Sequence, residues 1–278
     1  MQCTTQYLRT LIMVIWIGCT ASNVTYAGES PDHVRSAGCG IIQIGAGNFI
    51  AEEIRVLDLN RSYHLYVPNK YDPHRAYPLI FRWHGFGGDG LSGGLGIEQM
   101  VGNEAIIVSA DGLNKSWKVN GDPADLQFFD RMLDTIEKKY CIDRDRVFSY
   151  GFSVGGAFAN LLACERGDVL RGSAAIESGP RAGTAIALGS NCKGKVASWF
   201  LHDLDDHIVP IEGGRAARDR AITLNGCSAD TVNEGNSCVR YQGCKKSPVV
   251  WCESKGFGHN IRGDFAPALV WDFFRKLR

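Results

Sequence analysis

Residues 146–163 read RVFSYGFSVGGAFANLLA, and this stretch decides the fold. Strand-forming residues at 146–150 are followed directly by Gly-Phe-Ser-Val-Gly at 151–155, and then by an apolar, alanine-rich run typical of a helix. A strand, a tight turn reading G-x-S-x-G and a helix predict a nucleophile elbow, in which Ser153 projects its hydroxyl from the end of a strand. The two glycines leave room where a Cβ would clash. The N–H of Val154 is then expected to point where an oxyanion would form.

Strand and helix patterns alternate along the rest of the chain. Buried strands are expected at 78–83, 105–109, 172–177, 197–202 and 248–252, and helices from Asp122, over 212–224 and from Phe265. This succession predicts the α/β class, with a mainly parallel central sheet and helices on both faces. Two strand-like segments, 53–59 and 62–67, are expected to form a hairpin, and the cysteine-rich stretch 227–244 is expected to be a stapled loop.

A second glycine-rich motif follows the expected strand at 78–83. Residues 84–88 read His-Gly-Phe-Gly-Gly, and glycines directly after a strand let the backbone approach a ligand and present free N–H groups. In a serine hydrolase such a loop supplies the other oxyanion donor, which we expect to be an amide near Phe86. The alternative interpretation is a flexible glycine-rich turn.

The N-terminal segment has the features of a secretory signal. Arg9 supplies a positive charge, residues 11–18 form an apolar core too short to span a bilayer, and Thr-Tyr-Ala at 25–27 is an acceptable cleavage site. We therefore predict a signal peptide over residues 1–27 and a single secreted domain over residues 28–278.

Cysteine usage agrees with export. Cys19 ends an Ile-Gly-Cys triplet that resembles a bacterial lipobox, so lipid attachment there is the alternative to a cleaved signal. Without Cys3 and Cys19 an even number remains, which fits four disulfides in an oxidising compartment: Cys39, Cys141, Cys164, Cys192, Cys227, Cys238, Cys244 and Cys252. Proximity in sequence favours the pairs Cys238–Cys244 and Cys227–Cys252. Because there is no C-x-x-C pair and the histidines are not spaced like ligands, we predict no metal site.

Charge and composition exclude several classes of partner. The chain has 30 basic and 30 acidic residues, so its net charge is zero, and no basic stripe is present. We therefore expect no nucleic acid, no anionic membrane surface and no membrane span among its partners. The segment 41–50 contains only two glycines of a dinucleotide fingerprint and no helix pattern follows it, so no cofactor is expected. The oligomeric state is left open.

The groups that a serine nucleophile needs follow Ser153 in the chain. His259 lies among glycines after the last expected strand and is the best candidate for a general base. An acid between the two would complete the Ser, acid, His order of α/β-hydrolases. The acid lies among three aspartates in the loop after the strand at 197–202: Asp203, Asp205 and Asp206.

Three further residues are candidates for substrate contact. His84 and His202 stand at strand ends, where they are expected to line the site. Trp117 follows the strand at 105–109 and either lines a substrate cleft or packs on the surface.

The motifs GFSVGG (151–156), HGFGG (84–88), HDLDDHIVP (202–210) and GFGHN (256–260) resemble the esterase family that joins microbial feruloyl esterases with secreted polyhydroxybutyrate depolymerases. The resemblance runs from about Gly38 to the C-terminus. The family pattern H-G-x-x-D-x-x-V-P implies Asp206 as the triad acid, and the family's serine and histidine fall on Ser153 and His259. Many relatives have Trp-Pro shortly after the histidine, whereas this chain has Asn-Ile-Arg-Gly at 260–263.

The resemblance implies an α/β-hydrolase fold and a secreted, cofactor-free serine esterase. The expected substrates are hydroxycinnamoyl (feruloyl) esters on plant cell-wall xylan, with depolymerisation of polyhydroxyalkanoate as the alternative. An acyltransferase or an acetyl-xylan esterase with the same triad comes third. A carbohydrate-binding protein without catalytic activity belongs to a different class, and the complete triad argues against it.

Overall fold

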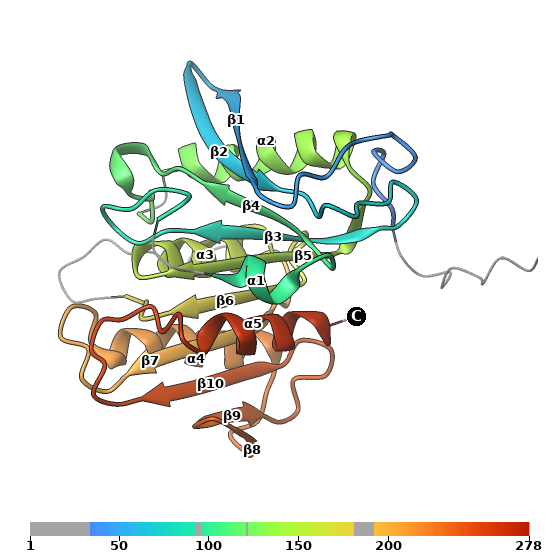
Figure 1. Cartoon of the computed structure of the whole chain (residues 1–278). Helices are drawn as coiled ribbons and strands as arrows, with labels where there is room; N and C mark the ends of the chain where they lie inside the picture. The colour runs from blue at the N-terminus through green and yellow to red at the C-terminus, as the bar shows by residue number, and fades with distance from the viewer. Residues whose placement is uncertain (1–33, 93–95, 121, 181–191, 278) are drawn as a thin grey trace, which may run out of the picture. The chain divides into compact units, whose positions relative to one another are not determined.

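Parallel strands form the middle of the sheet in the computed structural model, which describes residues 34–92, 96–120, 122–180 and 192–277. In these residues ten strands lie in the order β1-β2-β4-β3-β5-β6-β7-β10-β9-β8. The strands are β1 (Phe49–Val56), β2 (Leu59–Tyr66), β3 (Tyr77–Trp83), β4 (Ile106–Ala110), β5 (Ile142–Phe152), β6 (Gly172–Ile176), β7 (Ala197–Asp203), β8 (Thr231–Gly235), β9 (Cys238–Tyr241) and β10 (Val249–Ser254). Strands β4, β3, β5, β6, β7 and β10 run parallel to one another, and an antiparallel hairpin extends each edge, β1–β2 beside β4 and β9–β8 beside β10 (Figure 1).

Helices cover both faces of this sheet. They are α1 (Ile97–Val101), α2 (Ala124–Lys139), α3 (Val154–Glu165), α4 (Ile211–Asn225) and α5 (Ala266–Arg275), with a 3-10 turn at Leu113–Lys115. Successive residues of β3 point to opposite faces. Leu79 and Phe81 pack in a core with residues of α2 and α3, whereas Ile80 packs with residues of α1 and α5. On the face opposite α5, Phe200 of β7 packs with residues of α4. The predicted α/β fold with helices on both faces is confirmed.

The two edge hairpins differ in how well the sequence predicts them. The hairpin expected near 53–67 is confirmed by β1 and β2. Residues 227–244, expected to be a stapled loop, instead contain the hairpin β8–β9. The stapling is confirmed, since the Cys227–Cys244 disulfide joins the ends of this segment. The expectation of a loop is wrong because β9 adds antiparallel to the edge of β10, and this partner lies beyond the segment in sequence. Helix α1 was not predicted, since five residues are too few to show a helical period.

Four disulfides join the eight expected cysteines. The pairs are Cys39–Cys141, Cys164–Cys192, Cys227–Cys244 and Cys238–Cys252. Both pairings expected from sequence proximity, Cys238–Cys244 and Cys227–Cys252, are therefore wrong. Cys238 and Cys252 are direct register partners on β9 and β10, so the strand pairing sets their side chains next to each other. Sequence spacing carries no information about this register.

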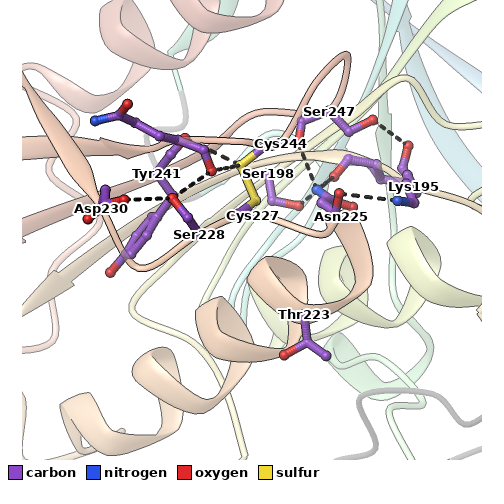
Figure 2. The surroundings of a disulfide bond; sticks show 12 residues. Lys195, Ser198, Thr223, Asn225, Cys227, Ser228, Asp230, Tyr241, Cys244 and Ser247 are labelled. Atoms are coloured by element: carbon purple, nitrogen blue, oxygen red, sulfur yellow. Dashed lines mark hydrogen bonds between the residues drawn. A yellow bond between two sulfur atoms is a disulfide. The ribbon is translucent and has the colours of Figure 1, made fainter.

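The end of α4 is fastened to the sheet around the Cys227–Cys244 disulfide (Figure 2). The side-chain amide of Asn225 donates to the carbonyl of Val196 at 2.8 Å and to that of Ser247 at 2.9 Å. These two carbonyls precede β7 and β10, so one buried amide ties the helix end to both strands. The disulfide covalently links the next turn to the loop after β9.

The signal segment predicted over residues 1–27, and the alternative of lipid attachment at Cys19, lie outside the described residues. Within those residues, the structure contains no helix of the length and apolarity needed to cross a membrane.

Candidate active site

Ser153 occupies the sharp turn between β5 and α3. Its φ of 56° and ψ of −123° place a non-glycine residue in a sparsely populated backbone region, which its surroundings must stabilise. The Ser153 N–H donates to the carbonyl of Ile176 at 2.9 Å and thereby ties the turn to β6. A Cβ at Gly155 would lie 2.2 Å from the carbonyl oxygen of Trp83, so only glycine fits there. The G-x-S-x-G stretch thus forms the strained turn that its sequence predicts.

Three side chains from three loops form one hydrogen-bonded chain. His259 Nε2 lies 2.9 Å from Ser153 Oγ, and His259 Nδ1 lies 2.7 Å from Asp206 Oδ2. A carboxylate only accepts hydrogen bonds, so Nδ1 carries the proton and Nε2 is free to accept the serine hydroxyl. These residues follow the carboxyl ends of β5, β7 and β10, which lie on the same side of the sheet because the strands are parallel. Asp206 is therefore the one of the three candidate aspartates that contacts His259.

The environment of Asp206 keeps it charged. Burial acts to raise its pKa, but the hydrogen bond from His259 and those from the amides of Val209 and Ile208 outweigh burial and hold the pKa below its usual value. Asp206 Oδ1 accepts both amides, at 2.9 and 2.8 Å, which leaves Oδ2 for His259. A buried carboxylate in this arrangement can orient an imidazole and stabilise it when it becomes protonated.

The other two aspartates of this loop shape the segment that carries His259. Asp203 Oδ2 accepts the hydroxyl of Ser254 at 2.7 Å and the amide of Phe257 at 3.2 Å, and its Oδ1 accepts the amide of Gly258 at 3.1 Å. Asp205 accepts the amide of Gly256 at 3.0 Å. Asp203 at the end of β7 and Asp205 in the loop after it thus fasten the segment that follows β10. Asp203 and Asp205 are therefore not triad acids, and their hydrogen bonds to the segment after β10 are not evident from the sequence.

His84 is buried and holds the glycine-rich loop after β3 in shape. Its Nδ1–H donates to the carbonyl of Gly85 at 2.7 Å, and its Nε2 accepts the amide of Gly112 at 3.0 Å. A Cβ at Gly85 would lie 2.9 Å from the ring of Phe152, the residue before Ser153, so this loop runs against the elbow. The expectation that His84 lines the site is corrected, because both ring nitrogens are engaged with backbone.

Trp117 is neither a cleft residue nor a surface residue. It is 4 % exposed, its ring stacks on Phe158 at 5.3 Å, and its Nε1–H donates to the carbonyl of His84 at 2.9 Å. The expectation that it contacts substrate is therefore corrected. The loop after β4 folds back over the core, where an indole buries a large apolar area and still satisfies its N–H.

His202 is also buried, behind Asp206. Its Nε2–H donates to the carbonyl of Val209 at 2.8 Å, and burial lowers its pKa, so the ring is neutral. It lies beside Asp206 and Glu177, and the three residues each place a donor atom within 4.8 Å of the others, as a cation would require. These atoms already serve hydrogen bonds within the protein. His202 therefore packs behind Asp206. The expectation that it contacts substrate is corrected. Glu177 was missed by sequence analysis, and its only signal is a carboxyl group ending an apolar strand.

Fold and site together define a serine esterase of the α/β-hydrolase class. Acetyl xylan esterase from Aspergillus awamori superposes with a TM-score of 0.63 at 14% identity, over 81% of this chain and 99% of that chain. The feruloyl esterase module from Clostridium thermocellum superposes with a TM-score of 0.60 at 13% identity, over 88% of this chain and 95% of that chain. At these identities the likeness establishes the fold alone. No protein-family model matches the chain.

Curated relatives define the family more closely. Feruloyl esterase D of Neurospora crassa is 34% identical over 244 residues, which cover 78% of this chain and 82% of that protein. Probable feruloyl esterase C of Aspergillus terreus is 32% identical over 236 residues, which cover 77% of this chain and 83% of that protein. The chain belongs to the feruloyl esterase family, as the resemblance of its motifs indicates.

Proposed function

We propose that this protein is a secreted feruloyl esterase that releases hydroxycinnamic acids from plant cell-wall xylan, with Ser153, His259 and Asp206 as its catalytic triad. The observation that carries the triad assignment is the unbroken hydrogen-bonded chain from Ser153 Oγ through both nitrogens of His259 to Asp206 Oδ2. The substrate class rests on the names of the relatives and on the apolar residues around Ser153.

In the proposed reaction Ser153 Oγ attacks the ester carbonyl while His259 Nε2 takes the hydroxyl proton. The resulting imidazolium is stabilised by Asp206, and the oxyanion by the N–H groups of Val154 and Phe86. Collapse of the tetrahedral intermediate breaks the ester C–O bond, and His259 returns its proton to the leaving alcohol. Water then attacks the acyl-enzyme by the same route, which releases the acid and restores Ser153.

Exposed apolar side chains around the triad support an aromatic acyl group. Phe86 is 80 % exposed in the loop after β3, Ile208 is 56 % exposed after β7, and Phe257 is 53 % exposed after β10. All three loops follow the carboxyl ends of parallel strands, as Ser153 follows the carboxyl end of β5. Exposed apolar residues gathered at a site indicate an apolar ligand. We therefore assign the contacts with the ferulate ring to these residues, in place of Trp117.

Export is supported by the cysteines. Four disulfides suit an oxidising compartment, and the predicted signal over residues 1–27 would deliver the chain there. N-terminal sequencing of the mature protein is expected to begin at Gly28. A lipid-modified N-terminus at Cys19 would contradict soluble secretion.

Hydrolysis of methyl ferulate by wild type and Ser153→Ala tests the activity, with acetylated xylan and a 3-hydroxybutyrate oligomer measured in parallel. Wild type is expected to prefer the ferulate, and the variant to lose at least about 10³-fold in kcat. A fluorophosphonate probe should label wild type at Ser153. Ferulate hydrolysis that survives in Ser153→Ala would contradict the triad, and a preference for the oligomer would make the protein a polyester depolymerase.

A further inference from the structure

Glu177 is a buried residue in an unfavourable backbone conformation, directly after β6. Its side chain is fully buried, and its φ is 46°, in the left-handed region that non-glycine residues rarely adopt. Its N–H donates to the carbonyl of Leu201 at 2.9 Å and keeps this position attached to β7. A strained backbone and a buried carboxyl both cost stability, and such costs concentrate at functional sites.

The carboxyl group of Glu177 contacts the loop that carries Asp206. Each of its oxygens lies 3.0 Å from the amide nitrogen of Asp203. Oε2 lies 3.5 Å from Nε2 of His202. A carboxyl oxygen of Glu177 also lies within 4.8 Å of a carboxyl oxygen of Asp206, in the buried group that these two residues form with His202. The carboxyl group therefore faces the last two residues of β7 and, in the loop that follows, Asp206.

Glu177 and Asp206 are both buried and lie within 4.8 Å of each other, and two carboxyl groups so placed do not both stay ionised. One of them therefore holds a proton. Asp206 has hydrogen bonds from His259 and from two amides, which favour its charged form. Glu177 has the Asp203 amide, and burial together with the neighbouring Asp206 and Asp203 raises its pKa to about 9. The hydrogen bonds that Asp203 accepts lower its pKa, and burial lowers the pKa of His202. Near neutral pH the cluster thus contains two carboxylates, a neutral imidazole and a protonated Glu177.

We propose that Glu177 is a positioning residue of the active site, whose carboxylic acid donates a hydrogen bond to Asp206 and holds it for His259. This role rests on the triad proposed above. The acid supplies a donor without adding a second negative charge beside His259. An ionised glutamate would instead place a second negative charge beside Asp206 and repel it from its position against His259.

Three substitutions at Glu177 separate positioning from bulk stability. Glu177→Gln keeps the length, the neutrality and an N–H donor toward Asp206. Glu177→Leu keeps most of the volume but removes the donor, and Glu177→Asp keeps the acid but withdraws it by one methylene. Asp125→Asn serves as the matched control, because Asp125 is a buried carboxyl paired with Arg61 and contacts no triad residue in the described part of the chain.

We measure kcat and KM for methyl ferulate from pH 5 to 10.5, normalised to active sites titrated with fluorophosphonate. Glu177→Leu and Glu177→Asp are expected to lower kcat by about 10- to 100-fold with KM within about threefold, because an interaction that orients the base is lost. Glu177→Gln is expected to restore kcat to within about threefold of wild type near pH 7. The wild-type rate should change as Glu177 ionises near pH 9, and Glu177→Gln should lack this step.

Several outcomes would overturn the proposal. Glu177→Leu with a wild-type kcat, or Glu177→Gln as impaired as Glu177→Leu, would show that the neutral donor is not needed. If Glu177→Leu does not fold, an unchanged alkaline step in Glu177→Gln still contradicts the role. If Asp125→Asn lost as much kcat as Glu177→Leu, the loss in Glu177→Leu would reflect lower stability and not the positioning of Asp206. If EDTA abolished the activity and Zn²⁺ restored it, a bound cation and not a hydrogen bond would join Glu177 to Asp206. Activity in Ser153→Ala would instead refute the triad itself.

Discussion

Asp125 and Glu177 are both fully buried carboxyl groups, but the protein accommodates them in opposite ways. Asp125, in the first turn of α2, forms an ion pair with Arg61 of β2 at 2.9 Å, and the guanidinium also lies 4.1 Å from the centre of the Phe128 ring. Glu177 instead faces the carboxyl groups of Asp206 and Asp203 and takes up a proton. A buried charge needs either a partner of opposite sign or neutralisation. The first solution joins a strand to a helix, whereas the second places a neutral donor beneath a triad.

The largest loss of activity is expected when Asp206, which must stay charged, is made neutral. Asp206→Asn removes the carboxylate that holds the proton on His259 Nδ1, so the imidazole adopts the wrong tautomer. We expect kcat for methyl ferulate to fall by about 10³- to 10⁴-fold with the fold intact. Steady-state kinetics with circular dichroism as the folding control measure this. A loss below about tenfold would mean that Asp206 is not the triad acid.

Asp125→Ala tests how much the buried ion pair between Asp125 and Arg61 contributes to stability. The substitution leaves the buried Arg61 guanidinium without its carboxylate, and we expect the free energy of unfolding to fall by about 3–5 kcal/mol. Urea denaturation with the disulfides intact measures the change. The double variant Arg61→Met/Asp125→Leu is the control, because an apolar pair should recover most of the loss. A single variant within about 1 kcal/mol of wild type would contradict the importance of this ion pair.

The proton on Glu177 makes stability depend on pH. In the unfolded chain a glutamate releases its proton near its ordinary pKa, whereas in the folded protein Glu177 keeps it up to about pH 9. Between these values the folded state holds one more proton, so its stability falls as pH rises, by about 1.4 kcal/mol per pH unit. The contribution is complete below the unfolded pKa and is lost by about pH 9.

Urea denaturation of wild type and Glu177→Gln at pH 6 and pH 8 isolates this contribution. The glutamine has no proton to lose, so the variant should gain about 2–3 kcal/mol relative to wild type between the two pH values. Parallel pH dependence in the two proteins would mean that Glu177 is already ionised at pH 6.

The smallest effect is expected at a carboxylate that is only partly buried. Asp205 accepts one amide, that of Gly256, at 3.0 Å. We expect Asp205→Asn to change the free energy of unfolding by less than about 1 kcal/mol and kcat/KM by less than about threefold. Asp203→Asn in the same loop should cost more, since Asp203 accepts four hydrogen bonds from the backbone and Ser254. If the two substitutions changed the free energy of unfolding equally, Asp203 would not be the main attachment of the segment after β10.

The order of elements and the nucleophile are matters of local sequence. Strand formers, the spaced glycines and the apolar helix after Ser153 mark the turn within a few adjacent residues, although contacts with β3 and β6 hold it in place. The same holds for the parallel strands, whose continuous apolar runs reflect burial on both faces. For this reason the α/β fold, Ser153 and His259 are readable from the sequence.

Only the tertiary structure decided the pairing of cysteines, the depth of side chains and the protonation of Glu177. Cys238 meets Cys252 through strand register, and Trp117 is buried because a loop folds back over the core. Family resemblance pointed to Asp206, but its contact with His259 and its support by Glu177 arise where the ends of β6, β7 and β10 converge. These properties depend on distances between residues remote in sequence and on the desolvation that burial imposes, which local patterns do not encode.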